Sequence, residues 1–237
     1  MEPFRFKKFS VSHQVGFKVG TDAVLLGTLT PITATTQRAL DIGTGSGVVA
    51  LMLLQRGISS AVGVEIDAAA ASEAAENARE SAWSENLQIV CADFCNLSAL
   101  TPLGLFDLIV SNPPFFSNSL KSPDNKRNTT RHNDNSLPLE RLLHNSASLL
   151  SENGCLSLIL PLPEAALFRQ KAIAYELFPT EIYHILSKPH KSESRQILVL
   201  ERQRPPQPPV EKTICVHQDN GDYSAEYQEL TLGFYLS

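Results

Sequence analysis

The chain has 237 residues, of which 43% are hydrophobic and 19% are charged. These proportions exclude a disordered protein and predict a globular one with a single large domain, with or without small extensions. The formal net charge of -5 argues against a protein that coats nucleic acid by bulk electrostatics, although a local basic face is compatible with it.

The cysteines predict neither a disulfide framework nor a metal site. No pair of them has Cys-x-x-Cys spacing, and no histidine lies near them at zinc-ligand spacing; they are Cys91, Cys95, Cys155 and Cys215. We therefore expect reduced, buried thiols and no bound metal. The first residues lack the apolar core of a signal peptide, and no apolar run is long enough to span a bilayer. These features predict a cytoplasmic protein without a membrane partner.

The first segment of the chain, residues 1–35, interleaves aromatic and basic side chains. Its phenylalanines and cations are Phe4, Phe6, Phe9, Phe17, Arg5, Lys7, Lys8 and Lys18. The pattern is compatible with short strands that cover the core as a flap. A second interpretation is a nucleic-acid contact that combines base stacking with phosphate binding. Thr21 and Asp22 then precede the apolar run 23–27, which predicts an N-cap in front of a short helix.

From residue 39 onward, short apolar runs alternate with longer helical stretches. Strands are predicted at 39–42, 61–66, 87–90, 106–110, 154–160, 181–187 and 195–200, and helices at 48–56, 68–79, 137–150 and 164–176. This alternation predicts an α/β fold with a mostly parallel, seven-stranded sheet and helices on both faces. A short turn joins the last two strands, so the last strand should be antiparallel. Glu73, Glu76 and Glu80 should form a solvated face of their helix.

Two further stretches lie outside this alternation. Residues 117–136 are polar and carry several cations without periodicity, which predicts a loop beside the binding site. A proline-rich spacer at 205–209 leads into a tail whose apolar residues should pack back on the body: Tyr223, Tyr227, Leu230 and Phe234. We therefore divide the chain into an N-terminal segment at 1–35 that includes a helix covering the site, a core at 36–203 and a C-terminal tail at 204–237.

Polar or glycine residues follow each of the first four predicted strands, at 41–47, 65–67, 92–94 and 112–115. Open parallel sheets bind ligands at the carboxyl ends of their strands, near the point where the strand order reverses. Four separate stretches should therefore meet at one crevice.

The first three of these stretches suit an adenosine ligand. Gly43, Gly45 and Gly47 follow Asp41 in a tight strand-to-helix turn, but their spacing differs from the dinucleotide pattern Gly-x-Gly-x-x-Gly. Glu65 can accept both hydroxyls of a ribose, and Asp93 can accept a hydrogen from an adenine amino group, with Phe94 or Ile66 against the ring. The alternative for each carboxylate is a cap or turn role. A glycine turn without a phosphate-binding lysine favours S-adenosyl-L-methionine.

The fourth stretch is Asn112-Pro113-Pro114-Phe115, directly behind an apolar strand. The prolines cannot donate to a sheet ladder and fix the direction of the preceding groups. The Asn112 side-chain oxygen and the Pro113 carbonyl can accept both hydrogens of an amino group on a planar system, while Phe115 stacks on the ring. These residues predict methylation of a conjugated amino nitrogen, which is otherwise a poor nucleophile.

In these four motifs the chain resembles class I S-adenosylmethionine-dependent methyltransferases, with their Rossmann-like fold. The resemblance implies that the tetrad Asn112, Pro113, Pro114 and Phe115 is catalytic. It also implies that the cofactor is bound by Asp41, Gly43, Gly45, Gly47, Glu65, Ile66, Asp93, Phe94 and Asn112.

A more specific resemblance is to the bacterial tRNA(Val) adenine-N6 methyltransferase family. It is carried by the run 16–27, by Arg131-His132 and by the closing stretches 223–227 and 234–236. It implies methyl transfer to N6 of an adenine beside the anticodon, with tRNA as the partner and no obligate protein partner. It also implies that Thr21 and Asp22 lie near the methionine end of the cofactor.

Three alternatives stay open. Glutamine N5 methyltransferases share Asn-Pro-Pro with an aromatic residue, but they carry a sizeable helical N-terminal domain, and only about 35 residues precede the sheet here. A ribosomal RNA or DNA amino methyltransferase is the second alternative, and DNA enzymes usually add a recognition domain. The third is a non-catalytic module that binds adenosine or RNA.

Overall fold

The computed structural model describes residues 2–15, 19–113 and 138–236. Several sequence predictions lie outside the described residues: Phe17, Lys18, Pro114, Phe115 and the polar loop 117–136 with Arg131 and His132.

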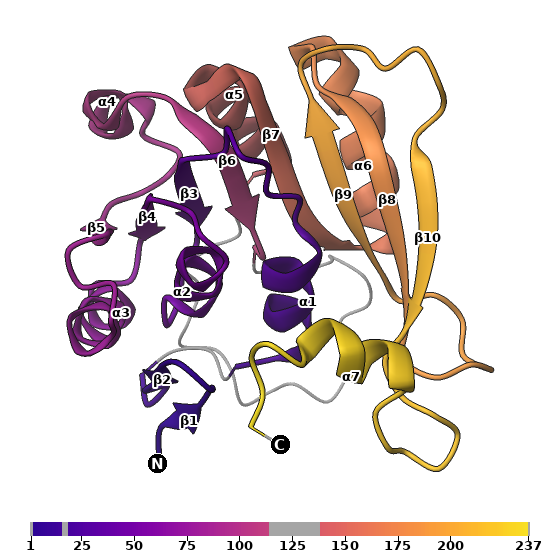
Figure 1. Cartoon of the computed structure of the whole chain (residues 1–237). Coiled ribbons are helices and arrows are strands. Elements are labelled where there is room, and N and C mark those ends of the chain that lie inside the picture. Colours follow the sequence, from indigo (N-terminus) through magenta and orange to yellow (C-terminus); the bar gives the residue numbers. More distant parts are fainter. Residues whose placement is uncertain (1, 16–18, 114–137, 237) are drawn as a thin grey trace, which may run out of the picture.

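The described chain is built on an eight-stranded sheet with the order β10-β8-β9-β7-β6-β3-β4-β5 (Figure 1). Its strands are β3 (Arg38–Ile42), β4 (Ser60–Glu65), β5 (Leu87–Cys91), β6 (Phe106–Ser111), β7 (Leu150–Pro161), β8 (Phe178–Leu186), β9 (Arg195–Glu201) and β10 (Val210–Cys215). All neighbouring strands are parallel except β9, which is antiparallel to both β7 and β8. The predicted mostly parallel α/β sheet with an antiparallel last predicted strand is confirmed.

The predicted strand number was wrong by one, because β10 adds an eighth strand. Val210 pairs with Glu181 and Cys215 with Leu186 in a parallel register along β8. Most side chains of β10 are exposed, so it lacks the buried alternation that marks an internal strand. Its pairing with β8 comes from residues far away in the sequence, which local pattern does not show.

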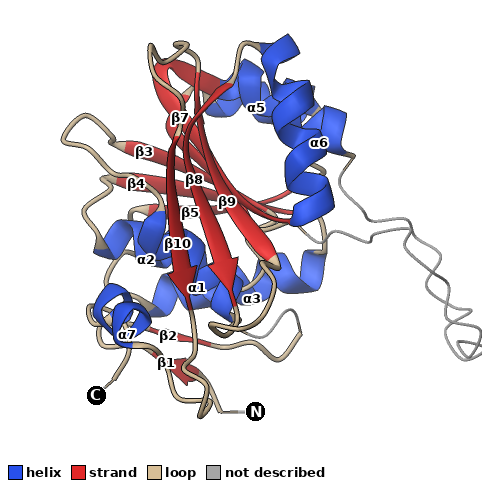
Figure 2. Cartoon of the chain, turned by 90° about the vertical axis from the view of Figure 1, so that its right-hand side faces the viewer, coloured by secondary structure: helices blue, strands red, loops and turns tan. Residues whose placement is uncertain are grey.

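Helices cover both faces of the sheet, and Figure 2 shows α5 and α6 on one side of it and α1, α2 and α3 on the other. The helices are α1 (Thr21–Leu29), α2 (Val48–Gln55), α3 (Ala68–Glu80), α4 (Leu97–Leu100), α5 (Leu139–Leu149), α6 (Leu162–Ala172) and α7 (Ala225–Thr231), with 3-10 turns η1 (Thr101–Leu103) and η2 (Ile173–Tyr175). Along β6, Leu108 and Val110 belong to the core beneath α1 and α2, whereas Ile109 belongs to the other core. The period of two along the strands therefore supplies both cores.

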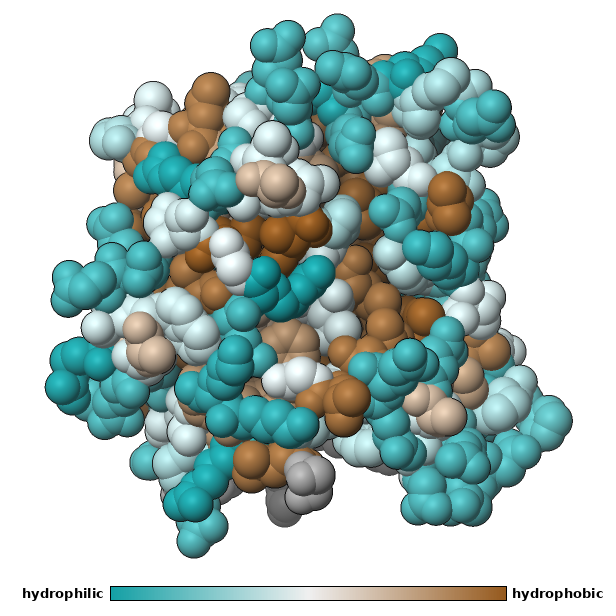
Figure 3. Space-filling model, in the orientation of Figure 1, coloured by the Kyte–Doolittle hydropathy of each residue, from teal (hydrophilic) through white to brown (hydrophobic). Residues whose placement is uncertain are grey.

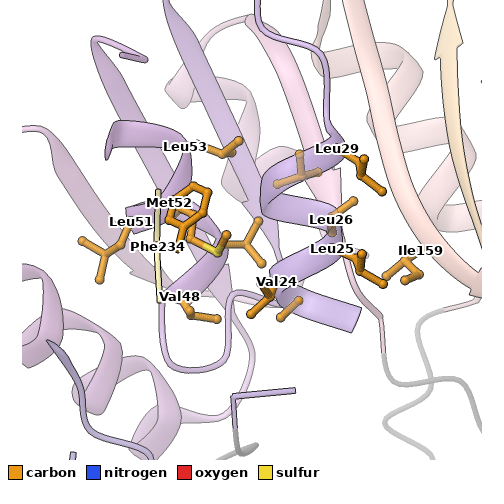
Figure 4. Packing of buried hydrophobic residues seen from close by; sticks show 14 of the residues in the cluster. Val24, Leu25, Leu26, Leu29, Val48, Leu51, Met52, Leu53, Ile159 and Phe234 are labelled. Carbon is orange, nitrogen blue, oxygen red and sulfur yellow. The ribbon is translucent and has the colours of Figure 1, made fainter. Parts of the chain in front are cut away.

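Helices α1 and α2 pack against each other, and the first residues of α1 lie near the carboxyl ends of the central strands. A Cβ atom on Gly27 would come within 2.8 Å of the Met52 sulfur, so a side chain at this position would require Met52 to shift. Met52 also lies beside Phe234 of the C-terminal tail, in the same hydrophobic core (Figure 4). The N-cap predicted at Thr21-Asp22 was too late in the chain: both residues lie in the first turn of α1, and the cap is Gly20, in an extended conformation.

The N-terminal segment forms a small hairpin of β1 (Phe4–Arg5) and β2 (Ser10–Val11), which pair antiparallel. Phe6 and Phe9 are buried and stack with centroids 4.5 Å apart. These two rings therefore belong to the core, as the flap interpretation expects.

The segment that follows the hairpin is fixed to α3 by two side chains. The Asn77 amide accepts from Ser12 N at 2.8 Å and donates to Ser12 O and Ser46 O, each at 2.9 Å. Glu73 Oε2 accepts from the backbone nitrogens of Gln14 and Val15. The prediction that Glu73 only faces solvent was therefore wrong, because backbone amides from another part of the chain need an acceptor there.

The tail returns to the body through α7, which contacts α1 and β10. Tyr227 and Phe234 are buried in the same core as α1 and α2, and Leu230 packs against that core. Tyr223 differs from them because its side chain is 40% exposed.

Candidate active site

The first three predicted stretches and the described residues of the fourth, Asn112 and Pro113, meet at the carboxyl ends of β3, β4, β5 and β6. They line one cavity of about 810 Å³, which also includes the start of α1 and Pro138. The lining residues are Gly20, Thr21, Asp22, Ala23, Asp41, Ile42, Gly43, Thr44, Gly45, Ser46, Val48, Val49, Val64, Glu65, Ile66, Ala92, Asp93, Phe94, Cys95, Asn112, Pro113 and Pro138. Strand β3 lies between β4 and β6 in the sheet. The chain adds β4 and β5 on one side of β3 and then β6 on its other side, so the strand order reverses at β3.

The turn between β3 and α2 depends on its glycines. Gly43, Gly45 and Gly47 have φ values of 68°, 56° and 81°, all in the left-handed region that disfavours a side chain. A fourth glycine, Gly63 on β4, lies beneath the turn, where a Cβ atom would come within 2.9 Å of both Thr44 and Ile89. The backbone therefore approaches the cavity closely and leads directly into the first amides of α2.

Asp41 supports this turn from inside the protein. Its Oδ2 atom accepts from the Thr44 hydroxyl at 2.7 Å and from Ala50 N at 3.2 Å. Burial raises the pKa of Asp41 to about 6, against its ordinary 3.8, although both hydrogen bonds act in the opposite direction. Asp41 thus lines the cavity while its hydrogen bonds join the glycine turn to α2.

Glu65 holds the two loops on either side of the cavity with different oxygen atoms. Oε2 accepts from Gly45 N and Oε1 accepts from Asp67 N, each at 3.0 Å. A carboxylate has about four acceptor positions, so each oxygen can accept one more hydrogen bond from a ligand hydroxyl. The geometry is compatible with a role in binding both hydroxyls of a ribose.

Two apolar side chains were predicted beside the adenine ring, and they differ in exposure. Ile66 is 50% exposed, whereas Phe94 is 4% exposed and belongs to the core between the sheet and α5. Because an apolar side chain that lines a cavity and remains exposed gains by being covered, Ile66 is the better ring contact. Phe94 is held in place by Asn145, whose amide donates to the Phe94 carbonyl oxygen at 2.6 Å.

Asp93 combines a turn role with a position at the cavity wall. Its Oδ1 atom accepts from Cys95 N at 2.8 Å, which is the local role that the alternative interpretation expects. Burial, with a smaller contribution from the Asp93 charge, raises the pKa of the Cys95 thiol. Cys95 itself lines the cavity and was not predicted as a site residue.

Asn112 and Pro113 follow β6 and line the cavity beside the end of β3. Ser111, the last residue of β6, donates from its hydroxyl to the Ile42 carbonyl oxygen at 3.0 Å and so joins the ends of β6 and β3. Pro113 is buried and Asn112 is half-buried, and both line the cavity. The described half of the tetrad therefore faces the same space as the glycine turn and Glu65.

The start of α1 closes the cavity through Thr21 and Asp22. Asp22 Oδ2 accepts from Arg195 Nε at 3.2 Å, which ties α1 to the first residue of β9. Sequence reasoning placed Arg195 at the start of a predicted strand and missed this contact. The contact joins two residues that are 173 positions apart, so local pattern gave no signal for it.

Among the described residues, no group of His, Cys, Asp and Glu side chains is arranged to hold a metal ion. The helices within the described part of the chain are also too short or too polar to cross a membrane.

Comparisons with known proteins agree with this architecture. Residues 13–161 match the family model "Methyltransferase small domain". A Bacteroides fragilis protein named tRNA1(Val) (adenine(37)-N6)-methyltransferase is 42% identical over 234 residues, which cover 98% of this chain and 97% of the relative. A Porphyromonas gingivalis protein of the same name is 40% identical over 99% of this chain and 95% of the relative. A predicted O-methyltransferase from Agrobacterium tumefaciens shares the fold, with a TM-score of 0.68 over 90% of this chain and 96% of that chain at 18% identity.

Proposed function

The chain belongs to the methyltransferase small domain family, and from that membership we propose that it transfers a methyl group from S-adenosyl-L-methionine to N6 of adenine 37 in tRNA1(Val). The observation that carries the proposal is the 42% identity to the Bacteroides fragilis relative, because it extends over 98% of this chain and includes both terminal segments.

The described cavity fits the cofactor. The glycine turn offers backbone beside α2, Glu65 offers carboxylate oxygens for ribose hydroxyls, and Ile66 offers an exposed apolar face for the adenine. Thr21 and Asp22 lie at the end of the cavity formed by α1, which is compatible with a position near the methionine group. Bound there, the cofactor supplies an electrophilic methyl group on a positively charged sulfur.

The acceptor nitrogen is positioned by the tetrad. In the proposed complex, the Asn112 side-chain oxygen and the Pro113 carbonyl accept the two hydrogens of the adenine amino group. This arrangement orients the nitrogen lone pair toward the methyl group and favours a more pyramidal nitrogen. A general base is not required, because the nitrogen becomes acidic once alkylated and its proton leaves to water.

An RNA loop is a suitable substrate for such a pocket. Adenine in a loop can be turned out without breaking a base pair, so the energy of unstacking is small compared with flipping from a helix. We also propose that the protein acts in the cytoplasm. We further propose that residues 36–203, together with β10 of the same sheet, form the catalytic core on which 1–35 and the rest of the tail pack.

The direct test uses purified protein, methyl-labelled cofactor and an unmodified tRNA1(Val) transcript. We expect label in N6-methyladenosine after digestion to nucleosides, and none with a transcript that carries guanine in place of adenine 37. Label at a different nucleotide, or no transfer to the transcript or to bulk tRNA, would contradict the proposal.

Substitution of Asn112 tests the role of the tetrad. Asn112→Ala should lower kcat by roughly 100-fold or more, because one acceptor for the amino group is lost, while cofactor affinity stays within a few-fold. Asn153→Ala is the matched control, since Asn153 is an exposed asparagine that contacts Gln203 away from the cavity. Unchanged turnover in Asn112→Ala would show that the acceptor role is wrong.

A further inference from the structure

A second cavity, of about 550 Å³, lies between the N-terminal hairpin and the C-terminal tail. It is lined on one side by Phe4, Arg5 and Lys7, and on the other by tail residues that include Tyr223, Gln228 and Tyr235. Figure 3 shows hydrophobic atoms among hydrophilic ones at the lower edge of the molecule, where the tail ends. The pocket is separate from the cavity at the strand ends, since the two share no lining residue.

The two sides of this pocket are held together by backbone and ring contacts. Phe6 forms an antiparallel bridge with Tyr235, and Lys7 N donates to the Phe234 carbonyl oxygen at 2.8 Å. The Phe6 and Tyr235 rings stack at an interplanar angle of 14°. The pocket is therefore a built feature whose aromatic wall is fixed before any ligand arrives.

Its lining has the chemistry of a nucleotide site. The side chains of Arg5 and Lys7 are exposed and cationic, and none of the described lining residues is acidic. Tyr223 is 40% exposed, and its ring lies nearly parallel to that of Tyr235, with an interplanar angle of 18°. Aromatic faces stack on bases and cations bind phosphates, and together they bind single-stranded nucleic acid with little sequence preference.

The position of the pocket fits a substrate contact rather than a part of the common catalytic unit. The residues that line it lie outside the stretch 13–161 that matches the family model. The tail helix α7 packs on α1, whose first residues line the cofactor cavity, so the pocket and the cavity lie toward the same end of the molecule (Figure 1). Specificity commonly resides in such additions to a shared fold.

We propose that this pocket binds one nucleotide of the tRNA substrate at a distance from the target adenine. The base packs on the exposed part of the Tyr223 ring beside Tyr235, and the phosphate contacts Arg5 and Lys7. The inference rests on the proposed function in that it takes tRNA as the substrate. It also separates the two interpretations of the N-terminal segment: the inner rings, Phe6 and Phe9, complete the core, whereas Phe4 and Arg5 face the RNA.

The cationic side is tested with Arg5→Glu, because Lys7 Nζ also donates to the Leu232 carbonyl oxygen. The matched variant is Lys8→Glu, which makes the same change of charge on an exposed residue that does not line the pocket. With the unmodified tRNA1(Val) transcript we expect Arg5→Glu to raise KM at least tenfold with kcat unchanged, and at least fivefold more than Lys8→Glu. The slope of the logarithm of the binding constant against the logarithm of the salt concentration should also decrease by about 1, as expected for the loss of one phosphate contact. Equal effects of the two variants would overturn the proposal in favour of bulk electrostatics.

The aromatic side is tested with Tyr223→Ala and Tyr223→Phe. Loss of the ring should weaken tRNA binding at least fivefold, and the phenylalanine variant should bind like the wild type, since stacking needs only the ring. Thermal unfolding checks that both variants are folded. If Tyr223→Ala binds tRNA like the wild type while Arg5→Glu does not, the pocket is a general polyanion patch and the nucleotide assignment fails.

The outcome stays separate from that of the proposed function. If the wild type methylates the transcript and neither Arg5→Glu nor Tyr223→Ala changes KM, the inference alone is refuted. If the wild type transfers no methyl group, the proposed function is refuted, and filter binding of the same transcript to the same variants still decides whether the pocket binds RNA.

Discussion

Replacement of Asp41 by asparagine should make the protein more stable at neutral pH. Both hydrogen bonds of Asp41 are accepted by one oxygen atom, Oδ2, and an asparagine can place its own oxygen there. The variant therefore keeps the contacts with Thr44 and Ala50 and removes the buried charge, while an NH2 group takes the place of Oδ1.

The size of the effect follows from the pKa. Burial raises the pKa of Asp41 from 3.8 to about 6, and at about 1.4 kcal/mol for each pKa unit the ionised side chain costs the folded state about 3 kcal/mol at pH 7. Because the folded-state pKa is the higher one, the carboxyl does not lower stability below about pH 3.8. The loss grows as the pH rises from there to about 6 and is constant above that value. The free energy of unfolding of Asp41→Asn should exceed that of the wild type by the full amount only above pH 6.

Urea unfolding at pH 7.5 and at pH 4 measures this difference, with Asp41→Ala as the control that loses both hydrogen bonds along with the charge. Asp41→Ala should be about 2 kcal/mol less stable than Asp41→Asn. A pH-independent difference between Asp41→Asn and the wild type, or an asparagine variant that is less stable at pH 7.5, would refute the reasoning. We expect the stabilised variant to bind S-adenosyl-L-methionine more weakly, since the ligand is cationic and a nearby negative charge is lost.

Two further substitutions test the supports of the cavity. Asn77→Ala removes three hydrogen bonds of a buried amide and should lower the free energy of unfolding by about 2–4 kcal/mol. The control Asn86→Ala removes one exposed hydrogen bond and should lower it by less than about 1 kcal/mol. Equal losses in urea unfolding would contradict the role of Asn77 in fixing the N-terminal segment to α3. Glu65→Gln replaces one acceptor oxygen by an NH2 group that faces a backbone N–H. Cofactor affinity measured by calorimetry should therefore fall roughly 10- to 100-fold. An affinity within threefold of the wild type would show that the carboxylate is dispensable.

The order of strands and helices in the core could be predicted from sequence because each element carries its own periodic pattern. Strand β6 is an example, since its alternate residues enter the two cores on opposite faces of the sheet. The carboxyl ends of parallel strands lie at one edge, so a cavity lined by Gly45, Glu65, Asp93 and Asn112 could also be predicted from sequence. Strand β10 could not be predicted in this way. It pairs with β8, whose residues lie 29 positions earlier in the chain, and most of its side chains face solvent.

The parts of the site that sequence missed depend on contacts between distant residues. Arg195 pairs with Asp22, and nothing near either residue in the chain indicates the other. Asn77 is a partial exception, since it lies on the buried stripe of α3 with Ala70, Ala74 and Ala78. A polar residue on an apolar stripe needs hydrogen-bond partners, and this signal was available in the alanine-rich pattern. The burial of the Asp41 charge had no sequence signal, because the same residue type at the same strand end is often exposed.

The bridge between Phe6 and Tyr235 also has a consequence for synthesis of the protein. Phe6 is synthesised before its bridge partner Tyr235, which follows 229 residues later in the chain. At elongation rates of about 5–20 residues per second this delay is on the order of ten seconds or more. During that interval the sheet from β3 to β9 can form, while the ring of Phe6 remains without its stacking partner Tyr235. The bridge therefore forms last, and a nascent chain stalled before α7 should leave Phe6 more accessible to proteases than the finished protein does.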